Sequence, residues 1–109
     1  VGKTKLPIPS AAFELRQIVT GFWSGGVIID TGSPFTSLAD AAYGPLRKEL
    51  ARQLNRSLMQ PPADSGLDLC VARNDFDKLV PVMLFHFSGG ADMAVPPGSY
   101  WGRWTIHAG

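Results

Sequence analysis

One feature constrains this chain more than any other: the aliphatic run Val27-Ile28-Ile29, which leads directly into Asp30-Thr31-Gly32-Ser33. Three consecutive branched aliphatic residues are typical of a short strand that is buried on both faces. Because Gly32 and Pro34 interrupt regular strand pairing, a tight loop is expected immediately after Asp30. The sequence therefore predicts a carboxylate at the end of a buried strand, held by a short loop.

Asp30 stands in a setting that suggests chemistry. A carboxylate in a desolvated position is costly unless it is hydrogen-bonded or serves a purpose. Gly32 lets the backbone turn sharply and bring its N–H close to Asp30. Ser33 can donate its hydroxyl to the outer carboxylate oxygen, and Thr31 adds a second hydroxyl. From the residues alone two interpretations stay open: a catalytic carboxylate in its supporting loop, or an Asx turn at the end of a strand.

The fold class predicted for the whole chain is mostly β with one clear helix. Twelve glycines and nine prolines in 109 residues favour short strands joined by turns. The weaker signals are one or two strands within 1–19, a turn at 24–26, an extended segment at 35–38 and a strand at 67–71. The strongest strand signal covers 80–87, and the Ser-Gly-Gly turn after it leads back into 92–95 as a hairpin.

The helix is predicted from a change of period. Apolar residues recur at helical spacing from Tyr43 to Leu54, and basic residues follow the opposite side, as on a solvated helix face. Asp40 is the expected N-cap. Because Gly44-Pro45 is awkward inside a helix, we expect a distorted first turn or a regular part that begins at Pro45.

Composition excludes several classes of protein. The length fits one domain, and 45% hydrophobic with 17% charged residues argues against disorder. A net charge of +1 gives no reason to expect a nucleic-acid partner, and no run of roughly 18 apolar residues is present to span a membrane. Two histidines and one cysteine without ligand spacing predict no metal site, and no cofactor is expected. Cys70 is either a buried thiol or half of a disulfide whose partner lies outside this chain.

The segment 25–38 resembles the second active-site loop of plant pepsin-like aspartic peptidases, the nepenthesin-like and nucellin-like group. The similarity continues at Ala42-Tyr43, Leu46-Arg47, Leu67-Asp68-Leu69-Cys70, Val80-Pro81-Val82-Met83, Phe85-His86-Phe87 and from Gly89 to Tyr100. It spans 1–101 in family order. The resemblance implies that this region is an incomplete C-terminal lobe of the bilobal acid-protease fold, whereas 102–109 form a divergent tail.

The resemblance implies an aspartic endopeptidase, in which each of two lobes supplies one aspartate to a pair that shares a proton and holds a water. One carboxylate activates the water for attack on the scissile carbonyl and the other polarises that carbonyl. Two carboxylates that lie so near each other have pKa values that differ widely, because both cannot ionise easily, and aspartic peptidases are the standard example. Asp30 then matches the catalytic aspartate of the second lobe, and Thr31, Gly32 and Ser33 match its supporting loop. Gly32, Ser33 and Pro34 would line the cleft for an extended peptide substrate.

The same resemblance makes Cys70 an orphan half-cystine and implies two further expectations. The partner of this chain is the missing N-terminal lobe of the same protein, and the location is the secretory pathway or the cell exterior, although no signal peptide is visible. The other Asp-Ser-Gly sequence of the chain, at 64–66, lies in a loop rich in Pro, Ser, Asp and Gly and lacks the aliphatic run that precedes Asp30, so the chain by itself is expected to be inactive.

Two alternatives remain. One is a non-catalytic binding or inhibitor protein on a degenerate peptidase fold, as in the xylanase-inhibitor relatives. The other is a retropepsin-like homodimer, in which each copy gives one aspartate. The length fits such a dimer, but the helix soon after the loop and the absence of a late aliphatic-aliphatic-Gly segment do not.

Overall fold

A computed structural model describes residues 1–32 and 36–102. The elements, in chain order, are η1 (Ser10–Phe13), β1 (Leu15–Val19), β2 (Phe22–Gly25), α1 (Asp40–Leu54), η2 (Asn55–Ser57), β3 (Leu58–Met59), β4 (Cys70–Val71), α2 (Arg73–Leu79), β5 (Met83–His86), η3 (Ser88–Gly90), β6 (Asp92–Val95) and η4 (Pro97–Ser99), where η marks a 3-10 helix. The two α-helices and six strands contain similar numbers of residues, so the described part is mixed rather than mostly β.

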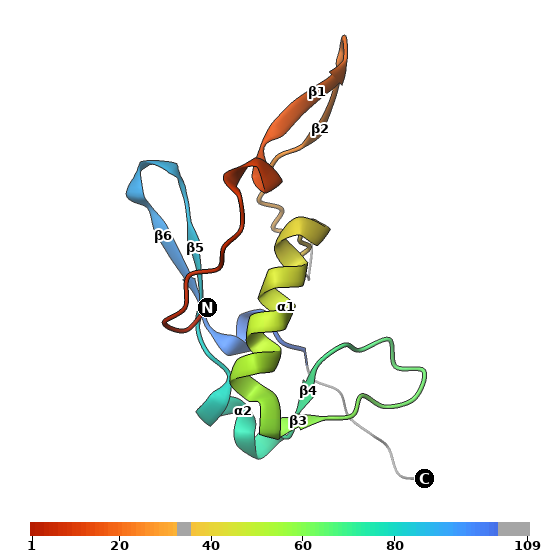
Figure 1. The fold of residues 1–109 in the computed structure, drawn as a ribbon, viewed down its shortest axis with the longest axis vertical. Coiled ribbons are helices and arrows are strands. Elements are labelled where there is room, and N and C mark those ends of the chain that lie inside the picture. The colour runs from red at the N-terminus through yellow and green to blue at the C-terminus, as the bar shows by residue number, and fades with distance from the viewer. Residues whose placement is uncertain (33–35, 103–109) are drawn as a thin grey trace.

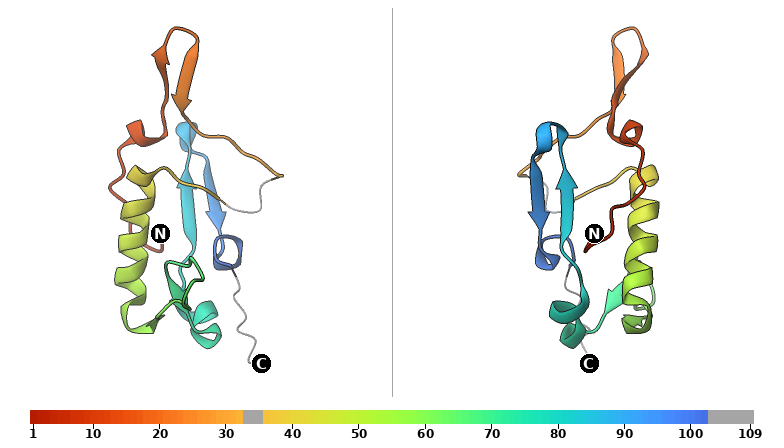
Figure 2. Two further views of the ribbon diagram at one scale, coloured as in Figure 1. Left: turned by 90° about the vertical axis from the view of Figure 1, so that its right-hand side faces the viewer. Right: turned by 60° about the vertical axis from the view of Figure 1, so that its left-hand side comes forward.

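The strands form three separate antiparallel pairs, β1–β2, β3–β4 and β5–β6. Figure 1 shows the β1–β2 hairpin projecting from one end of the molecule, while α1 runs beside the β5–β6 hairpin. The N-terminal segment lies between α1 and β5 in both views of Figure 2. Its place is fixed by the Gly2 N–H, which donates to the Val82 carbonyl at 2.9 Å, and by the Gln53 amide, which donates to the Val1 carbonyl at 3.3 Å.

The core is small and sits where α1, β5 and the N-terminus meet. Its buried residues are Val1, Leu46, Leu50 and Met83, and further apolar side chains pack against them, namely Leu6, Leu38, Leu69, Phe85, Val95, Tyr100 and Trp101. The last turn of α1 is also well covered, since Leu54 is only 1% exposed. Burying a leucine fully contributes about 1.5–3 kcal/mol, so the apolar stripe of α1 is the main source of stability.

The predicted helix is confirmed, but its start differs from the expectation. Ala39 is the N-cap and makes no side-chain capping bond, whereas Asp40 is the first helical residue. There its negative charge faces the positive end of the helix dipole. The helix passes through Pro45 as a continuous element. Because proline has no N–H, the Ala41 carbonyl loses its helical donor, and burial of the apolar stripe offsets that loss.

The prediction of a buried strand at Val27-Ile28-Ile29 is wrong for this chain. No strand is assigned between β2 and α1 among the described residues, and Ile28 and Ile29 are 86% and 82% exposed. The cause is the lack of a neighbour. The last backbone bond of the hairpin runs from the Gly26 N–H to the Glu14 carbonyl at 3.1 Å, and a strand without a paired strand has no ladder to hold it.

The hairpins agree with the sequence in part. The β5–β6 hairpin is confirmed, with Met83 opposite Val95 and His86 opposite Asp92. It is shorter than predicted because Pro81 has no N–H for a ladder. The turn expected at 24–26 instead lies at 20–21, so that β1 pairs directly with β2. The strand predicted at 67–71 is reduced to the two residues of β4, and the short α2 was not predicted.

The molecule is extended for its length. Its radius of gyration is 16.2 Å and its dimensions are 55 × 32 × 24 Å, whereas a compact domain of this length has a radius of gyration of about 13 Å. Its accessible surface is 8829 Å², against about 5900 Å² for a compact protein of this mass. Much apolar surface is therefore uncovered. Within the described ranges, no helix combines the length and apolarity that crossing a bilayer requires.

Candidate active site

The Asp30 loop is built by a local hydrogen bond. The Gly32 N–H donates to Asp30 Oδ1 at 2.9 Å, which closes a turn over Asp30-Thr31-Gly32. A β-carbon at position 32 would lie 3.3 Å from the same oxygen, so a side chain there would crowd the carboxylate. The expected role of Gly32, a backbone donor close to Asp30, is thus present.

The bond is compatible with both interpretations of the loop. A backbone donor two residues after an aspartate is the geometry of an Asx turn, and it is also a way to orient a catalytic carboxylate. Asp30 and Thr31 are exposed, in contrast to the desolvated position expected from the sequence. Ser33 and Pro34, the predicted outer-oxygen donor and cleft residue, lie outside the described residues.

The exposure of Asp30 follows from the segment that carries it. The three aliphatic residues before it are all exposed, and no strand packs beside them among residues 1–32 and 36–102. A carboxylate at the end of such a segment has water around it whatever its purpose. Within residues 1–32 and 36–102, nothing desolvates Asp30.

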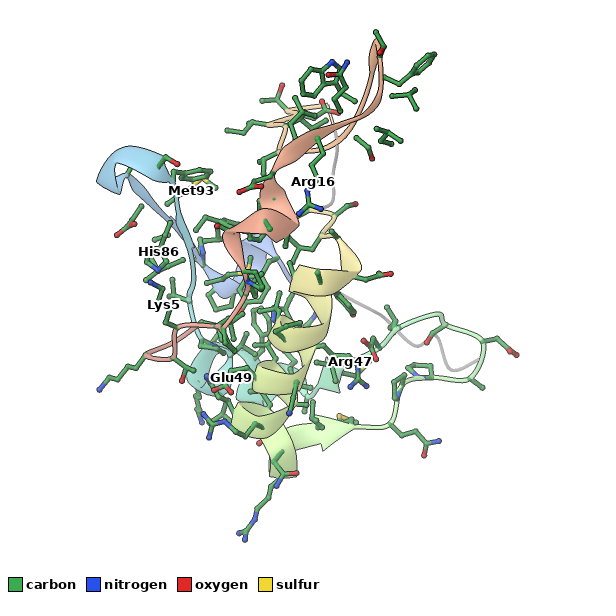
Figure 3. The ribbon with its side chains drawn as sticks, turned by 45° about the horizontal axis from the view of Figure 1, so that its top comes forward. Lys5, Arg16, Arg47, Glu49, His86 and Met93 are labelled. Carbon is green, nitrogen blue, oxygen red and sulfur yellow. The ribbon has the colours of Figure 1, made fainter. Side chains whose placement is uncertain are left out.

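A second polar cluster joins α1 to the loop before β4. Asp68 accepts the Tyr43 hydroxyl at 2.6 Å and the Arg47 Nε at 2.7 and 2.8 Å, and Figure 3 shows Arg47 on the side of α1 that faces this loop. The bond from Tyr43, and then that from Arg47, hold the pKa of Asp68 below its usual range. The bond to Asp68 and then burial raise the pKa of Tyr43.

Sequence reasoning missed this cluster. A signal existed, because Tyr43 and Arg47 are four residues apart and share one face of a helix. Asp68 and Arg47 line a groove of about 250 Å³, whose other lining residues include Leu46, Leu50, Met83 and Trp101. The cluster tethers the loop to the core and has no geometric link to Asp30.

The remaining candidates are simpler. Cys70 is a free, partly exposed cysteine in β4, and it is the only cysteine of the chain. His86 and Asp92, on opposite strands of the β5–β6 hairpin, form an exposed pair with Nδ1 and Oδ1 2.7 Å apart. Among the residues with described positions, no three His, Cys, Asp or Glu side chains gather as metal ligands would.

Comparison with known proteins gives the family. The family described as xylanase inhibitor C-terminal matches residues 1–105. Aspartic proteinase nepenthesin-1 from Nepenthes gracilis is 36% identical over 102 residues, which cover 92% of this chain and 22% of the relative. Aspartyl protease family protein 2 from Arabidopsis thaliana is 34% identical over 102 residues, covering 92% of this chain and 20% of the relative.

Aspartic proteinase nepenthesin-2 from Nepenthes gracilis is 33% identical over 92 residues, covering 83% of this chain and 20% of the relative. The chain thus spans about a fifth of the length of these relatives. No solved structure matches. The family match continues to residue 105, and the division of the chain after residue 101 stays a prediction. With its aliphatic run, its Asp-Thr-Gly-Ser loop and these similarities, the chain belongs to the xylanase inhibitor C-terminal family and is a relative of the nepenthesin-like plant aspartic proteinases.

Proposed function

We propose that this chain is part of the C-terminal lobe of an aspartic endopeptidase and supplies Asp30 as one of its two catalytic carboxylates. The observation that carries the proposal is the Asp-Thr-Gly-Ser loop with its Gly32-to-Asp30 bond of 2.9 Å, in a chain 36% identical to nepenthesin-1 over 92% of its length. Thr31 and Ser33 complete the supporting loop. Gly32, Ser33 and Pro34 line the cleft in which an extended peptide lies.

A single carboxylate cannot perform this chemistry. The mechanism needs one ionised and one protonated group on either side of a water, and two nearby carboxylates reach that state because both cannot ionise easily. The chain's other Asp-Thr/Ser-Gly sequence, Asp64-Ser65-Gly66, follows Pro61-Pro62-Ala63 in an irregular loop and lacks the aliphatic run that leads into Asp30. The second aspartate therefore comes from the N-terminal lobe of the same protein, which also covers part of the apolar surface left open here. The expected secretory or extracellular location belongs to the same proposal.

The test uses the complete polypeptide that contains this segment. We expect cleavage of an unfolded protein substrate at acid pH, inhibited by pepstatin, and a loss of at least about 10³-fold in kcat/KM for Asp30→Asn, since the group that positions and deprotonates the water is removed. Asp77→Asn, a change at an exposed carboxylate of α2, is the matched control and keeps the activity. The isolated chain is expected to cleave nothing at any pH. Full activity of Asp30→Asn would refute the assignment.

The name of the matching family supports a second candidate, a binding protein that inhibits a xylanase. In that case the complete polypeptide lowers xylanase turnover, shows no acid peptidase activity, and is indifferent to Asp30→Asn. Measuring both activities on the same two variants separates the candidates, because only the peptidase depends on the Asp30 carboxylate.

A retropepsin-like homodimer is tested on the isolated chain. Sedimentation at acid pH together with a peptidase assay would reveal a pepstatin-sensitive dimer if two copies of Asp30 formed one site. A monomer without activity agrees with the one-lobe proposal.

A further inference from the structure

We propose that Gly25 and Gly26 are positioning residues for Asp30: they set the direction in which the chain leaves the β1–β2 hairpin and so decide where the carboxylate lies. This inference rests on the proposed function. Gly25 ends β2, and Asp30 follows five residues later. Both glycines have positive φ angles, 86° and 81°. Two successive residues in this region turn the backbone sharply, and residues other than glycine adopt it at a cost.

Space at the junction is as restricted as the backbone angles. A β-carbon on Gly25 would lie 2.5 Å from the Glu14 carbonyl oxygen, which is backbone and cannot swing away. A β-carbon on Gly26 would lie 3.3 Å from the Leu15 β-carbon. Glycine at position 25 is therefore required twice, by its φ angle and by the close approach of Glu14.

The junction is also tied by a hydrogen bond. The Gly26 N–H donates to the Glu14 carbonyl at 3.1 Å, the same oxygen that a side chain on Gly25 would meet. Glu14 immediately precedes β1, so the base of the hairpin is closed at this point. The segment 27–30 begins at this closed base, and the backbone angles of the two glycines set its orientation relative to the hairpin.

Gly21 shows that positive φ alone does not make a positioning residue. It lies in the turn between β1 and β2 with φ of 82°, but a β-carbon there would meet nothing within 4 Å. It is at the opposite end of the hairpin from the Asp30 segment, as Figure 1 makes clear from the course of β1 and β2. Gly21→Ala is thus a matched control, since it strains the same hairpin without touching the junction.

The first experiment measures orientation in the isolated chain. Residual dipolar couplings of backbone N–H groups report the angle between the segment 26–32 and the β1–β2 hairpin. We expect Gly25→Ala to change that angle and to abolish the hydrogen-exchange protection of the Gly26 N–H, whereas Gly21→Ala changes neither. Gly26→Ala, where the crowding is milder, serves if Gly25→Ala does not fold.

A D-alanine at position 25 tests the cause, because a D-residue favours positive φ and directs its β-carbon away from the position that meets Glu14. The chain can be assembled by ligating a synthetic 1–69 segment to one that begins at Cys70, its only cysteine. We expect D-alanine to restore the wild-type orientation. Wild-type couplings in the L-alanine variant, or the same change for Gly21→Ala and Gly25→Ala, would overturn the inference.

The second experiment measures catalysis in the complete polypeptide. A misplacement of about 1 Å can lower a rate about 100-fold. We therefore expect Gly25→Ala to lower kcat by about that factor while KM stays within roughly threefold, and Gly21→Ala to leave both within about twofold. Equal losses for the two variants would indicate general instability and refute positioning. If the wild-type polypeptide has no peptidase activity, the proposed function fails, and the couplings decide the role of the glycines in the fold.

Discussion

Two regions of this chain, α1 and the segment 27–29, each carry three large aliphatic residues, but only those of α1 are buried. In α1, Leu46, Leu50 and Leu54 are buried, with Leu54 at 1% exposure, whereas Ile28 in the segment before Asp30 is 86% exposed. The difference lies in neighbours. The helix α1 packs against β5 and the N-terminal segment of this chain, whereas the segment 27–29 pairs with no strand among the described residues. An aliphatic run predicts a preference for burial, and the covering surface decides whether that preference is met.

The largest effect is expected when a charge is introduced into the exposed segment 27–29. We expect Ile28→Lys to change the free energy of unfolding of the isolated chain by no more than about 0.5 kcal/mol, because the side chain stays in water. In the complete polypeptide the same change is expected to destabilise by about 3–5 kcal/mol, because it buries an unpaired charge. Urea denaturation of both proteins measures this. Equal effects in both would mean that nothing covers Ile28.

The next test is a cavity in the covered region. Leu54→Ala is expected to cost about 3 kcal/mol, since it removes most of a fully buried side chain, and Ile28→Ala is the control with an expected change under about 0.5 kcal/mol. Urea denaturation of the isolated chain, followed by circular dichroism of the helix, gives both values. Similar losses for the two alanine variants would break the contrast between the regions.

The smallest effect is expected for the hydrogen bonds that join Asp68 to Tyr43 and Arg47 of α1. Tyr43→Phe removes the hydroxyl that donates to Asp68 at 2.6 Å, and we expect a loss of about 0.5–1 kcal/mol, reduced by the solvent around the pair. The folded-state pKa of Asp68 is lowered. The contribution of Asp68 to the free energy of unfolding is therefore complete above its unfolded-state pKa near 4, and it is lost as the pH falls through the lower folded-state pKa.

Because the pKa of Tyr43 is raised, its contribution is present below its unfolded value near 10 and is lost as the pH rises through the higher folded value. The difference in unfolding free energy between wild type and Tyr43→Phe should thus be flat from about pH 5 to 9 and shrink below about pH 4. Chemical denaturation across this range checks it. A difference that grows on acidification would contradict the assignment of the bond to the ionised Asp68.

The sequence predicted what local rules control and missed what depends on neighbours. The helix was found because its apolar stripe repeats every three to four residues, and the β5–β6 hairpin because Ser88-Gly89-Gly90 separates two strand-forming runs. The Gly32 bond to Asp30 also follows from local geometry. The tether of Asp68 to Tyr43 and Arg47 was missed because it joins positions more than 20 residues apart.

The burial predicted for Val27-Ile28-Ile29 was wrong because it, too, depends on contacts with other parts of the protein. The pattern predicted a strand that is covered on both faces, but the pattern alone cannot say whether the covering surface is encoded in the same 109 residues. The catalytic role proposed for Asp30 shares this dependence, since it needs a second carboxylate from another part of the protein.

The separation of the strands into three antiparallel pairs has a consequence for the order of folding. Each pair joins strands that are close in sequence, and β1 and β2 are separated by only two residues. Closing such short loops takes microseconds or less, so each pair can form early, before the packing that stabilises an otherwise marginal hairpin. Any larger sheet would then assemble by docking of finished pairs, which makes the long-range contacts late events.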